Sequence, residues 1–182
     1  LPGTSDANTD TYDLEKAKAY LEESGVDVSG MSFPIICSDD TKKRAGEVIQ
    51  ANLKEIGIEA NIESMDLATY LSTVAEGNFV AAIGGYGMGD TISYLNGVYH
   101  SKSINGSNKS RLNNPEIDAM IDQASATIDQ AQREALTEQI CAKLNEICTQ
   151  APLYQPLTLR AFNADLQGVK VNPNGDCRVE DM

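Results

Sequence analysis

The chain has 182 residues, of which 41% are hydrophobic, and this length and composition predict one compact domain with a substantial core. Lys and Arg total 14 against 27 Asp and Glu, so the net charge is -13, which argues against nucleic acid and against an anionic membrane surface as partners. No apolar run approaches the roughly 18 residues of a membrane span, and the first thirty residues lack the pattern of an export signal.

The first half of the chain alternates between helix and strand patterns. A polar stretch over residues 1–12 precedes a short helix, which we expect between Asp13 as N-cap and Gly25 as C-cap. The following pattern predicts strands at 31–37, 58–65 and 79–83, and helices at 41–57 and from 66 to 77. This order predicts an α/β fold with a mainly parallel sheet and flanking helices, because parallel strands are joined by crossovers.

The second half of the chain has a different character. A polar stretch over 101–113 leads to a helix that begins at Asn114 and Pro115, a good N-cap and first-turn pair. Asp129 and Gln132 resemble a capping box for a longer helix, whose apolar stripe includes Cys141 and Cys148. One or two further strands are expected over 153–162, followed by a polar, turn-rich tail.

The cysteines do not form a metal-binding pattern. Cys37, Cys141, Cys148 and Cys177 include no C-x-x-C pair, and His100 is the only histidine, so neither a tetrahedral metal site nor any cofactor is expected. Cys141 and Cys148 would lie about 10 Å apart along a helix, too far for a disulfide between them. We therefore expect buried free thiols, with both helical cysteines facing the core.

The glycine-rich segment 84–90 (GGYGMGD) follows the third predicted strand, and ligands of open parallel sheets gather at the carboxyl ends of the strands. A dinucleotide fingerprint would need a third glycine where Asp90 stands, so that match fails. The residues after Asp90 are also a poor match for a long phosphate-facing helix. Two interpretations remain: a glycine-rich turn, or a ligand-contact loop in which Tyr86 offers a flat apolar face and Asp90 a carboxylate for a cationic group.

Other candidate sites are weaker. Asp6, Asn8 and Asp10 mimic the first ligands of a calcium loop, but the glycine and glutamate that such a loop needs are absent. His100 has no nucleophile context and is expected to lie on the surface, so a catalytic triad has no support. The acidic residues are spread along helices and loops, which indicates a solvated surface.

Six motifs in the same order resemble one known family. They are YDLEKAKAYLEESG at 12–25, AGEVIQANLKEIGIEANIESMD at 45–66, GDTISYL at 89–95, NNPEIDAMIDQASATIDQAQREALTEQI at 113–140, APLYQPL at 151–157 and LQGV at 166–169. Together they resemble the C-terminal lobe of the family-5 extracellular solute-binding proteins, which serve dipeptide, oligopeptide, nickel and related ABC importers.

The resemblance implies a protein of two hinged lobes, with residues 1–182 forming one domain, the second lobe, and the N-terminal lobe absent from this chain. Such a protein is not an enzyme. It captures a peptide or a similar small solute between its lobes and delivers it to the permease subunits of the ABC importer. It works in an extracellular or periplasmic location and is held at the membrane only through an anchor outside this fragment.

The resemblance also suggests which residues bind the ligand. We expect the site at loops 38–40, 65–66 and 84–91, with these ligand-binding residues: Tyr86, Gly87, Met88, Asp90, Ser38 and Asp39. In peptide-binding members an aromatic residue precedes an Asp that pairs with the amino terminus of the ligand. Tyr86 resembles the aromatic residue, but Asp90 matches the Asp of the Asp-Pro pair of the family. Gly87 or Met88 stands at the anchoring position, which leaves neutral or larger solutes possible.

Two other functions are compatible with the sequence. One is a nucleotide-dependent α/β enzyme domain, which would need a phosphate-binding loop that the sequence does not contain. The other is a non-catalytic interaction lobe whose role is to contact permease subunits.

Overall fold

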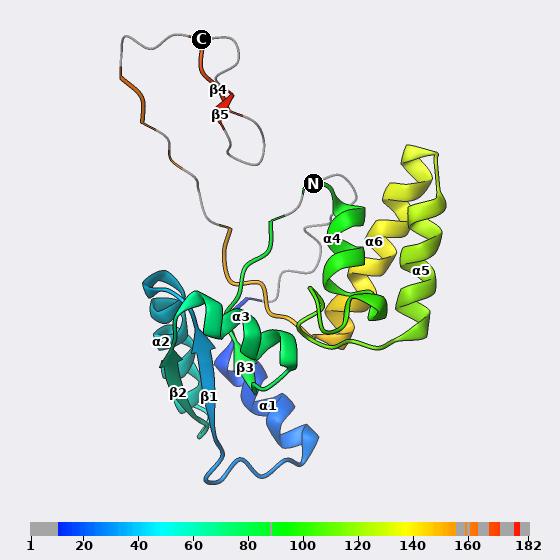
Figure 1. The fold of residues 1–182 in the computed structure, drawn as a ribbon. Helices are drawn as coiled ribbons and strands as arrows, with labels where there is room; N and C mark the ends of the chain where they lie inside the picture. Colours follow the sequence, from blue (N-terminus) through cyan, green and yellow to red (C-terminus); the bar gives the residue numbers. More distant parts are fainter. Residues whose placement is uncertain are drawn as a thin grey trace.

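The computed structural model describes residues 11–87, 89–155, 159, 161–163, 168–171 and 177–178. The helices are α1 (Leu14–Ser24), α2 (Asp40–Lys54), α3 (Leu67–Glu76), α4 (Thr91–Val98), α5 (Pro115–Ala126) and α6 (Gln130–Ile147), with a 3-10 helix at Ser101–Ser103. The strands are β1 (Ser32–Cys37), β2 (Glu59–Ser64), β3 (Ala81–Ala82), β4 (Lys170–Val171) and β5 (Cys177–Arg178). Figure 1 shows two groups of elements: the sheet with α1, α2 and α3 on the left, and α4, α5 and α6 on the right.

The predicted α/β fold with a parallel sheet is confirmed. The first three strands form one sheet in the order β2-β1-β3, and β1 pairs in parallel with both neighbours. The strands expected at 31–37 and 58–65 are present, whereas the third is reduced to Ala81–Ala82. Its short length follows from its pairing, because only Ala81 and Ala82 lie opposite β1 residues.

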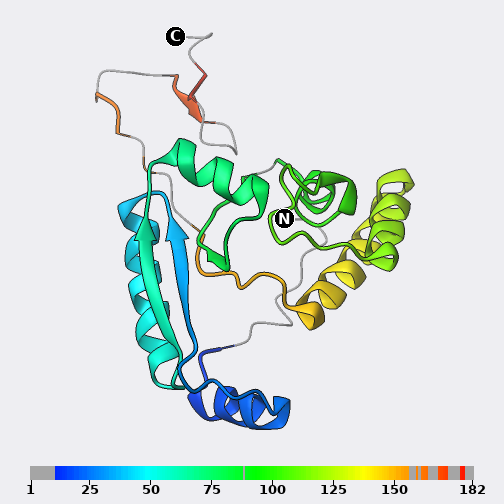
Figure 2. The ribbon, with the colours of Figure 1, turned by 60° about the horizontal axis from the view of Figure 1, so that its bottom comes forward.

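Helices cover both faces of this sheet, because successive residues of a strand point to opposite sides. Ile35 and Cys37 pack with residues of α2, and Ile36 packs with Tyr70 and Val74 of α3. Figure 2 shows α2 running along one side of the sheet. The prediction that Cys37 is a buried free thiol is confirmed, since its side chain is 0% exposed.

The last three helices have a core of their own. Its buried residues are Leu95, Ile117, Ile121, Ala124, Ile140 and Leu144. Both predicted helix starts are confirmed: Asn114 accepts a hydrogen bond from Glu116 N at 3.0 Å, and Asp129 accepts one from Gln132 N at 2.8 Å. The residues after Asp90 form a helix of only eight residues, α4.

One prediction about the cysteines is wrong. Helix α6 ends at Ile147, and Cys148 is its C-cap in the left-handed conformation with φ 52°, so its side chain leaves the apolar stripe and is exposed. Cys141 is half-buried within the helix. The side chain of Cys177 lies outside the described part of the structure.

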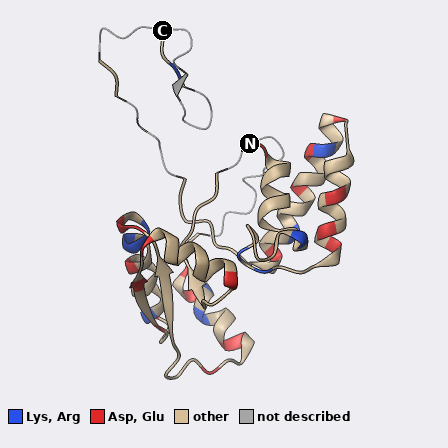
Figure 3. Ribbon diagram, viewed as in Figure 1, with Lys and Arg blue, Asp and Glu red and all other residues tan. Residues whose placement is uncertain are grey.

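The expected strands over 153–162 are not found among the described residues there, which are 153–155, 159, 161 and 162. Instead, a short antiparallel pair forms further on, where Lys170 lies opposite Arg178. In the described part of the chain, no helix has the length and apolar character needed to cross a bilayer. Figure 3 shows Asp and Glu distributed over helices of both groups.

Candidate ligand-binding site at the carboxyl edge of the sheet

The three loops predicted to form the site leave the same edge of the sheet. Because the strands are parallel, their carboxyl ends lie together, and the loops 38–40, 65–66 and 84–91 follow β1, β2 and β3. Backbone hydrogen bonds hold the loop starts in register: Met65 N donates to Cys37 O at 3.0 Å, and Ile83 N donates to Ile36 O at 2.9 Å.

Each of these loops contains an aspartate that caps the next helix. Asp39 accepts a hydrogen bond from Lys42 N at 2.9 Å and caps α2. Asp66 accepts from Thr69 N at 3.0 Å and caps α3, and Asp90 accepts from Ser93 N at 2.8 Å and caps α4. The first N–H groups of a helix have no partner within the helix, so a carboxylate is stabilised there.

These contacts keep the three carboxylates charged. The pKa of Asp39 is lowered chiefly by the side chain of Lys42, and the pKa of Asp66 chiefly by the hydroxyl of Thr69. The backbone hydrogen bond from Ser93 is the largest cause of the lowered pKa of Asp90. The carboxylates at this edge are therefore ionised at neutral pH and already serve the fold as caps.

Ser38 and Asp39 lie beside a cation from their own helix. The ammonium of Lys42 forms an ion pair with Asp39 and lies 3.4 Å from Ser38 Oγ. A cationic ligand group at Asp39 would therefore compete with Lys42, so the first of the three loops is the least suited to bind one.

The loop after β3 is held by a hydrogen bond at its start, and most of the residues that follow are glycines without side chains. The hydroxyl of Tyr70 donates to Ile83 O at 3.1 Å, and a Cβ on Gly84 would lie only 2.9 Å from that hydroxyl. A Cβ on Gly85 or Gly87 would meet no described atom within 4 Å beyond its chain neighbours. There is thus open space on the part of the loop that the sequence identified as a candidate contact.

Tyr86 lies in this loop, between Gly85 and Gly87. Its side chain is 44% exposed, its hydroxyl hydrogen-bonds to Ser107 Oγ, and its ring meets that of Tyr94 edge-on, with centroids 6.4 Å apart and planes at 70°. Gly87 is exposed, and Met88 lies outside the described residues. The ring of Tyr86 is therefore accessible and at the same time held from two sides.

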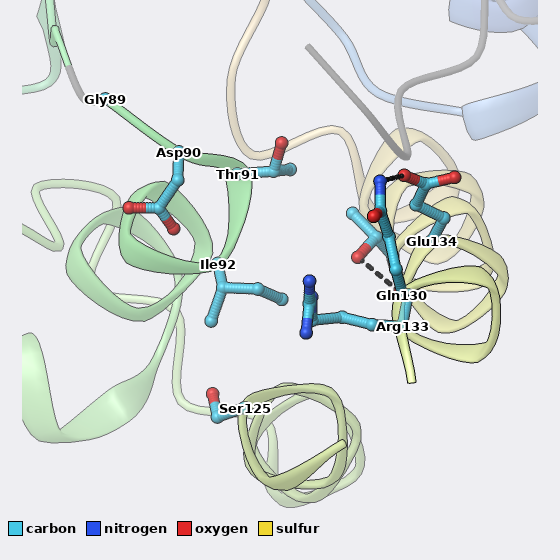
Figure 4. A pocket seen from close by; sticks show the side chains of 9 residues that line it. Gly89, Asp90, Thr91, Ile92, Ser125, Gln130, Arg133 and Glu134 are labelled. Atoms are coloured by element: carbon cyan, nitrogen blue, oxygen red, sulfur yellow. Dashed lines mark hydrogen bonds between the residues drawn. The ribbon is translucent and has the colours of Figure 1, made fainter. Parts of the chain in front are cut away.

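A cavity of about 480 Å³ is bounded by the start of α4, the end of α5 and the first half of α6. Its lining residues are Gly89, Asp90, Thr91, Ile92, Ser125, Gln130, Arg133, Glu134 and Thr137. In Figure 4, Arg133 extends from α6 toward Ile92. Sequence reasoning did not place Arg133 or Glu134 at this site, because both stand in a helical pattern far along the chain from Asp90.

Arg133 gives the cavity a fixed positive charge. Its Nη1 donates to Thr127 O at 3.0 Å and to Ile128 O at 3.3 Å, which fixes the guanidinium beside the turn between α5 and α6. The hydrogen bonds from Ser93 are the main cause of the lowered pKa of Asp90, and the charge of Arg133 makes only a minor contribution. The cavity thus offers both signs of charge to a polar solute.

His100 is buried, and the expectation of a surface histidine is wrong. It is 7% exposed, its Nε2 lies 3.3 Å from Asp122 Oδ1, and its Nδ1 accepts a hydrogen bond from Lys102 N at 3.2 Å. It caps the 3-10 helix, and this position turns its ring inward against α5. Among the described residues, no group of three or more His, Cys, Asp or Glu side chains is arranged to hold a metal ion.

Comparisons with known proteins agree with this architecture. Heme-binding protein A of Haemophilus influenzae is 28% identical over 171 residues, which cover 90% of this chain and 31% of that protein. A dipeptide-binding protein of Escherichia coli is 25% identical and covers 94% of this chain and 34% of its own length. The chain thus spans about a third of the length of these curated relatives.

Solved structures show the same fold. HbpA2 from Haemophilus parasuis matches with a TM-score of 0.75 and 26% identity over 81% of this chain and 31% of that one. A nickel ABC transporter structure from Bacillus halodurans matches with a TM-score of 0.66 and 28% identity over 82% of this chain and 34% of its own. Residues 1–106 match the family model of the bacterial extracellular solute-binding proteins, family 5 Middle. This chain therefore belongs to the family-5 bacterial extracellular solute-binding proteins.

Proposed function

We propose that this chain is the ligand-binding lobe of the substrate-binding component of an ABC importer, which captures a small solute and delivers it to the permease. The observation that carries the proposal is the meeting of three loops, with three ionised aspartates and the exposed ring of Tyr86, at one edge of the sheet. Membership in a solute-binding family supports the assignment of this edge to ligand binding.

The ligand belongs to the small solutes that such proteins carry, with peptides as the first candidates. Relatives are named as dipeptide-binding and heme-binding proteins, and one similar structure is a nickel ABC transporter. We infer that this chain lacks the Asp that pairs with the amino terminus of a peptide, because Gly87 or Met88 stands at that position. The ligand therefore does not need a free amino terminus. The carboxylate of Asp90 remains the best placed to attract a cationic group, because Arg133 shares its cavity without forming an ion pair within 4.0 Å in the described structure.

The proposal places the other face of the site on a second lobe outside these 182 residues, and the membrane anchor outside them as well. The chain is proposed to act in an extracellular or periplasmic location, as its family description implies for members. We also propose that it has no catalytic activity, in keeping with its membership in a solute-binding family. A thermal-shift assay with ATP and NAD tests the alternative of a nucleotide-dependent enzyme domain, which stabilisation by either nucleotide would favour.

Native mass spectrometry of the complete protein tests the function directly, because a captured solute is expected to remain bound during gentle purification. We expect an added mass below about 1 kDa that disappears on mild denaturation. An absence of any added mass, combined with no binding of peptides or heme in calorimetry, would contradict the proposal.

Asp90→Asn then tests the site. Asparagine caps a helix about as well as aspartate, so this change removes the charge and keeps the cap. Asp13→Asn is the matched control, because Asp13 caps α1 by the same bond, to Lys16 N at 2.9 Å, away from the proposed site. We expect weaker solute binding in Asp90→Asn alone. Unchanged binding with failed transport would favour a lobe that only contacts the permease.

A further inference from the structure

The orientation of Tyr86 is set by a residue far from it in the sequence. Its neighbours Gly85 and Gly87 have no side chains, so among the described residues of its own loop none holds the ring in place. Its hydroxyl hydrogen-bonds to Ser107 Oγ, although Ser107 comes 21 residues later. Together with the edge-on contact to Tyr94, this bond fixes both ends of an exposed side chain.

Ser107 is itself held by the residue that follows it. Asn108 is 1% exposed, and its Nδ2 donates to Tyr99 O at 3.3 Å, to His100 O at 3.2 Å and to Leu112 O at 2.9 Å. Its Oδ1 accepts from Leu112 N at 3.2 Å and from the hydroxyl of Ser110 at 3.0 Å. A fully bonded buried amide is a rigid support, so the position of Ser107 does not depend on a ligand.

Tyr94, which contacts the ring of Tyr86 edge-on, is also held in place by a neighbour. Tyr94 lies in α4 and packs edge-on against Tyr99, with centroids 5.9 Å apart and planes at 72°. The hydroxyl of Tyr99 donates to Gln150 Oε1 at 3.3 Å. Three tyrosines thus form a chain of contacts from the helical group to the candidate site, and only the first of them, Tyr86, is exposed.

We propose that Ser107 is a positioning residue that holds the ring of Tyr86 ready to stack on a flat aromatic or conjugated group of the ligand. The inference rests on the proposed ligand-binding function and names the chemistry of its ligand. An exposed ring that is already ordered loses little conformational entropy on binding. No side chain projects from Gly85 or Gly87, and a Cβ at either position would meet no described atom within 4 Å beyond its chain neighbours. The carboxylates nearby serve as helix caps and attract charged groups, whereas the exposed ring offers a flat apolar contact that they cannot provide.

The test uses calorimetry on the complete protein with three probes. Ala-Phe-Ala and Ala-Leu-Ala differ only in the flat ring, and protoporphyrin IX provides a flat group that is not a peptide. We expect Tyr86→Leu to weaken binding of a flat probe roughly two- to tenfold and to leave Ala-Leu-Ala nearly unchanged. Tyr86→Phe and Ser107→Ala should each weaken flat-probe binding to a smaller, similar extent.

The double variant separates positioning from general damage to the loop. Because Tyr86→Phe and Ser107→Ala remove the same hydrogen bond, combining them should cause no further loss. Ser110→Ala is the control, since its hydroxyl bonds to Asn108 and not to Tyr86, and it should lower stability without changing the preference for a ring. Additive losses in the double variant would overturn the role of Ser107.

The outcomes also separate this inference from the proposed function. Failure of both flat probes to bind, or unchanged flat-probe affinity in Tyr86→Leu, overturns the inference. If Ala-Leu-Ala or a co-purified solute still binds in that case, the proposed function stands. If nothing binds, both fail.

Discussion

At the scale of single residues, Asn108 has the largest predicted effect on stability. Asn108→Ala leaves three backbone carbonyls without their shared donor in a buried place, and each such loss is costly. We expect a loss of about 2–4 kcal/mol in the free energy of unfolding, measured by urea denaturation. Asn113→Ala is the control, because Asn113 is exposed and makes none of these bonds. A similar loss in both variants would contradict this role for Asn108.

The residues that the sequence identified correctly are those whose role is local. Asp13 and Asn114 were predicted as caps because a cap bonds to N–H groups two or three positions later, and the structure confirms both. His100 and Ser107 escaped prediction because their partners lie on other elements. Asp90 was predicted to bind the ligand through its carboxylate. The structure shows that this carboxylate caps α4, and its role in ligand binding stays a prediction.

At the scale of elements, the ends of α1 and α3 provide a matched comparison. Gly25 and Gly77 are both left-handed C-caps, with φ of 66° and 79°. A Cβ on Gly25 would meet nothing within 4 Å, whereas one on Gly77 would lie 2.8 Å from Nη1 of Arg111. Arg111 in turn donates to Asn105 Oδ1 at 2.8 Å, so Gly77 lies against the loop that carries Ser107.

We therefore expect Gly25→Ala to cost about 1 kcal/mol, the strain of a left-handed alanine, and Gly77→Ala to cost more. Urea denaturation of both variants measures the difference. Arg111→Ala in the Gly77→Ala background should recover the excess if the clash causes it. Equal losses in Gly25→Ala and Gly77→Ala would show that Arg111 moves aside freely.

Elements with a clear period were predictable, and elements defined by their partners were not. The helices that begin at Asn114 and Asp129 have both an apolar stripe and a cap, and both are present. The apolar run at 153–162 was expected to form strands, but a strand also needs a neighbour to pair with. The described part of that run has none, so apolar residues alone did not make it a strand.

At the scale of the whole molecule, the sheet and the last three helices have separate cores, and the candidate site lies where the sheet loops lead into the helical group. The family and the parallel sheet followed from the sequence, because both depend on patterns that run through most of the chain. The cavity at α4 did not, because it arises from packing of helices that are distant in sequence.

This arrangement predicts that the 182-residue chain alone binds solutes poorly. The side chains of Asp39, Tyr86 and Asp90 are exposed, whereas a tight site buries most of a ligand between two faces. We expect dissociation constants weaker than roughly 0.1 mM for Ala-Phe-Ala with the isolated chain in calorimetry, and tighter binding by the complete protein. Cooperative thermal unfolding of the isolated chain must accompany the measurement, so that weak binding is not a result of misfolding. Micromolar binding of Ala-Phe-Ala by the folded 182-residue chain would contradict this prediction.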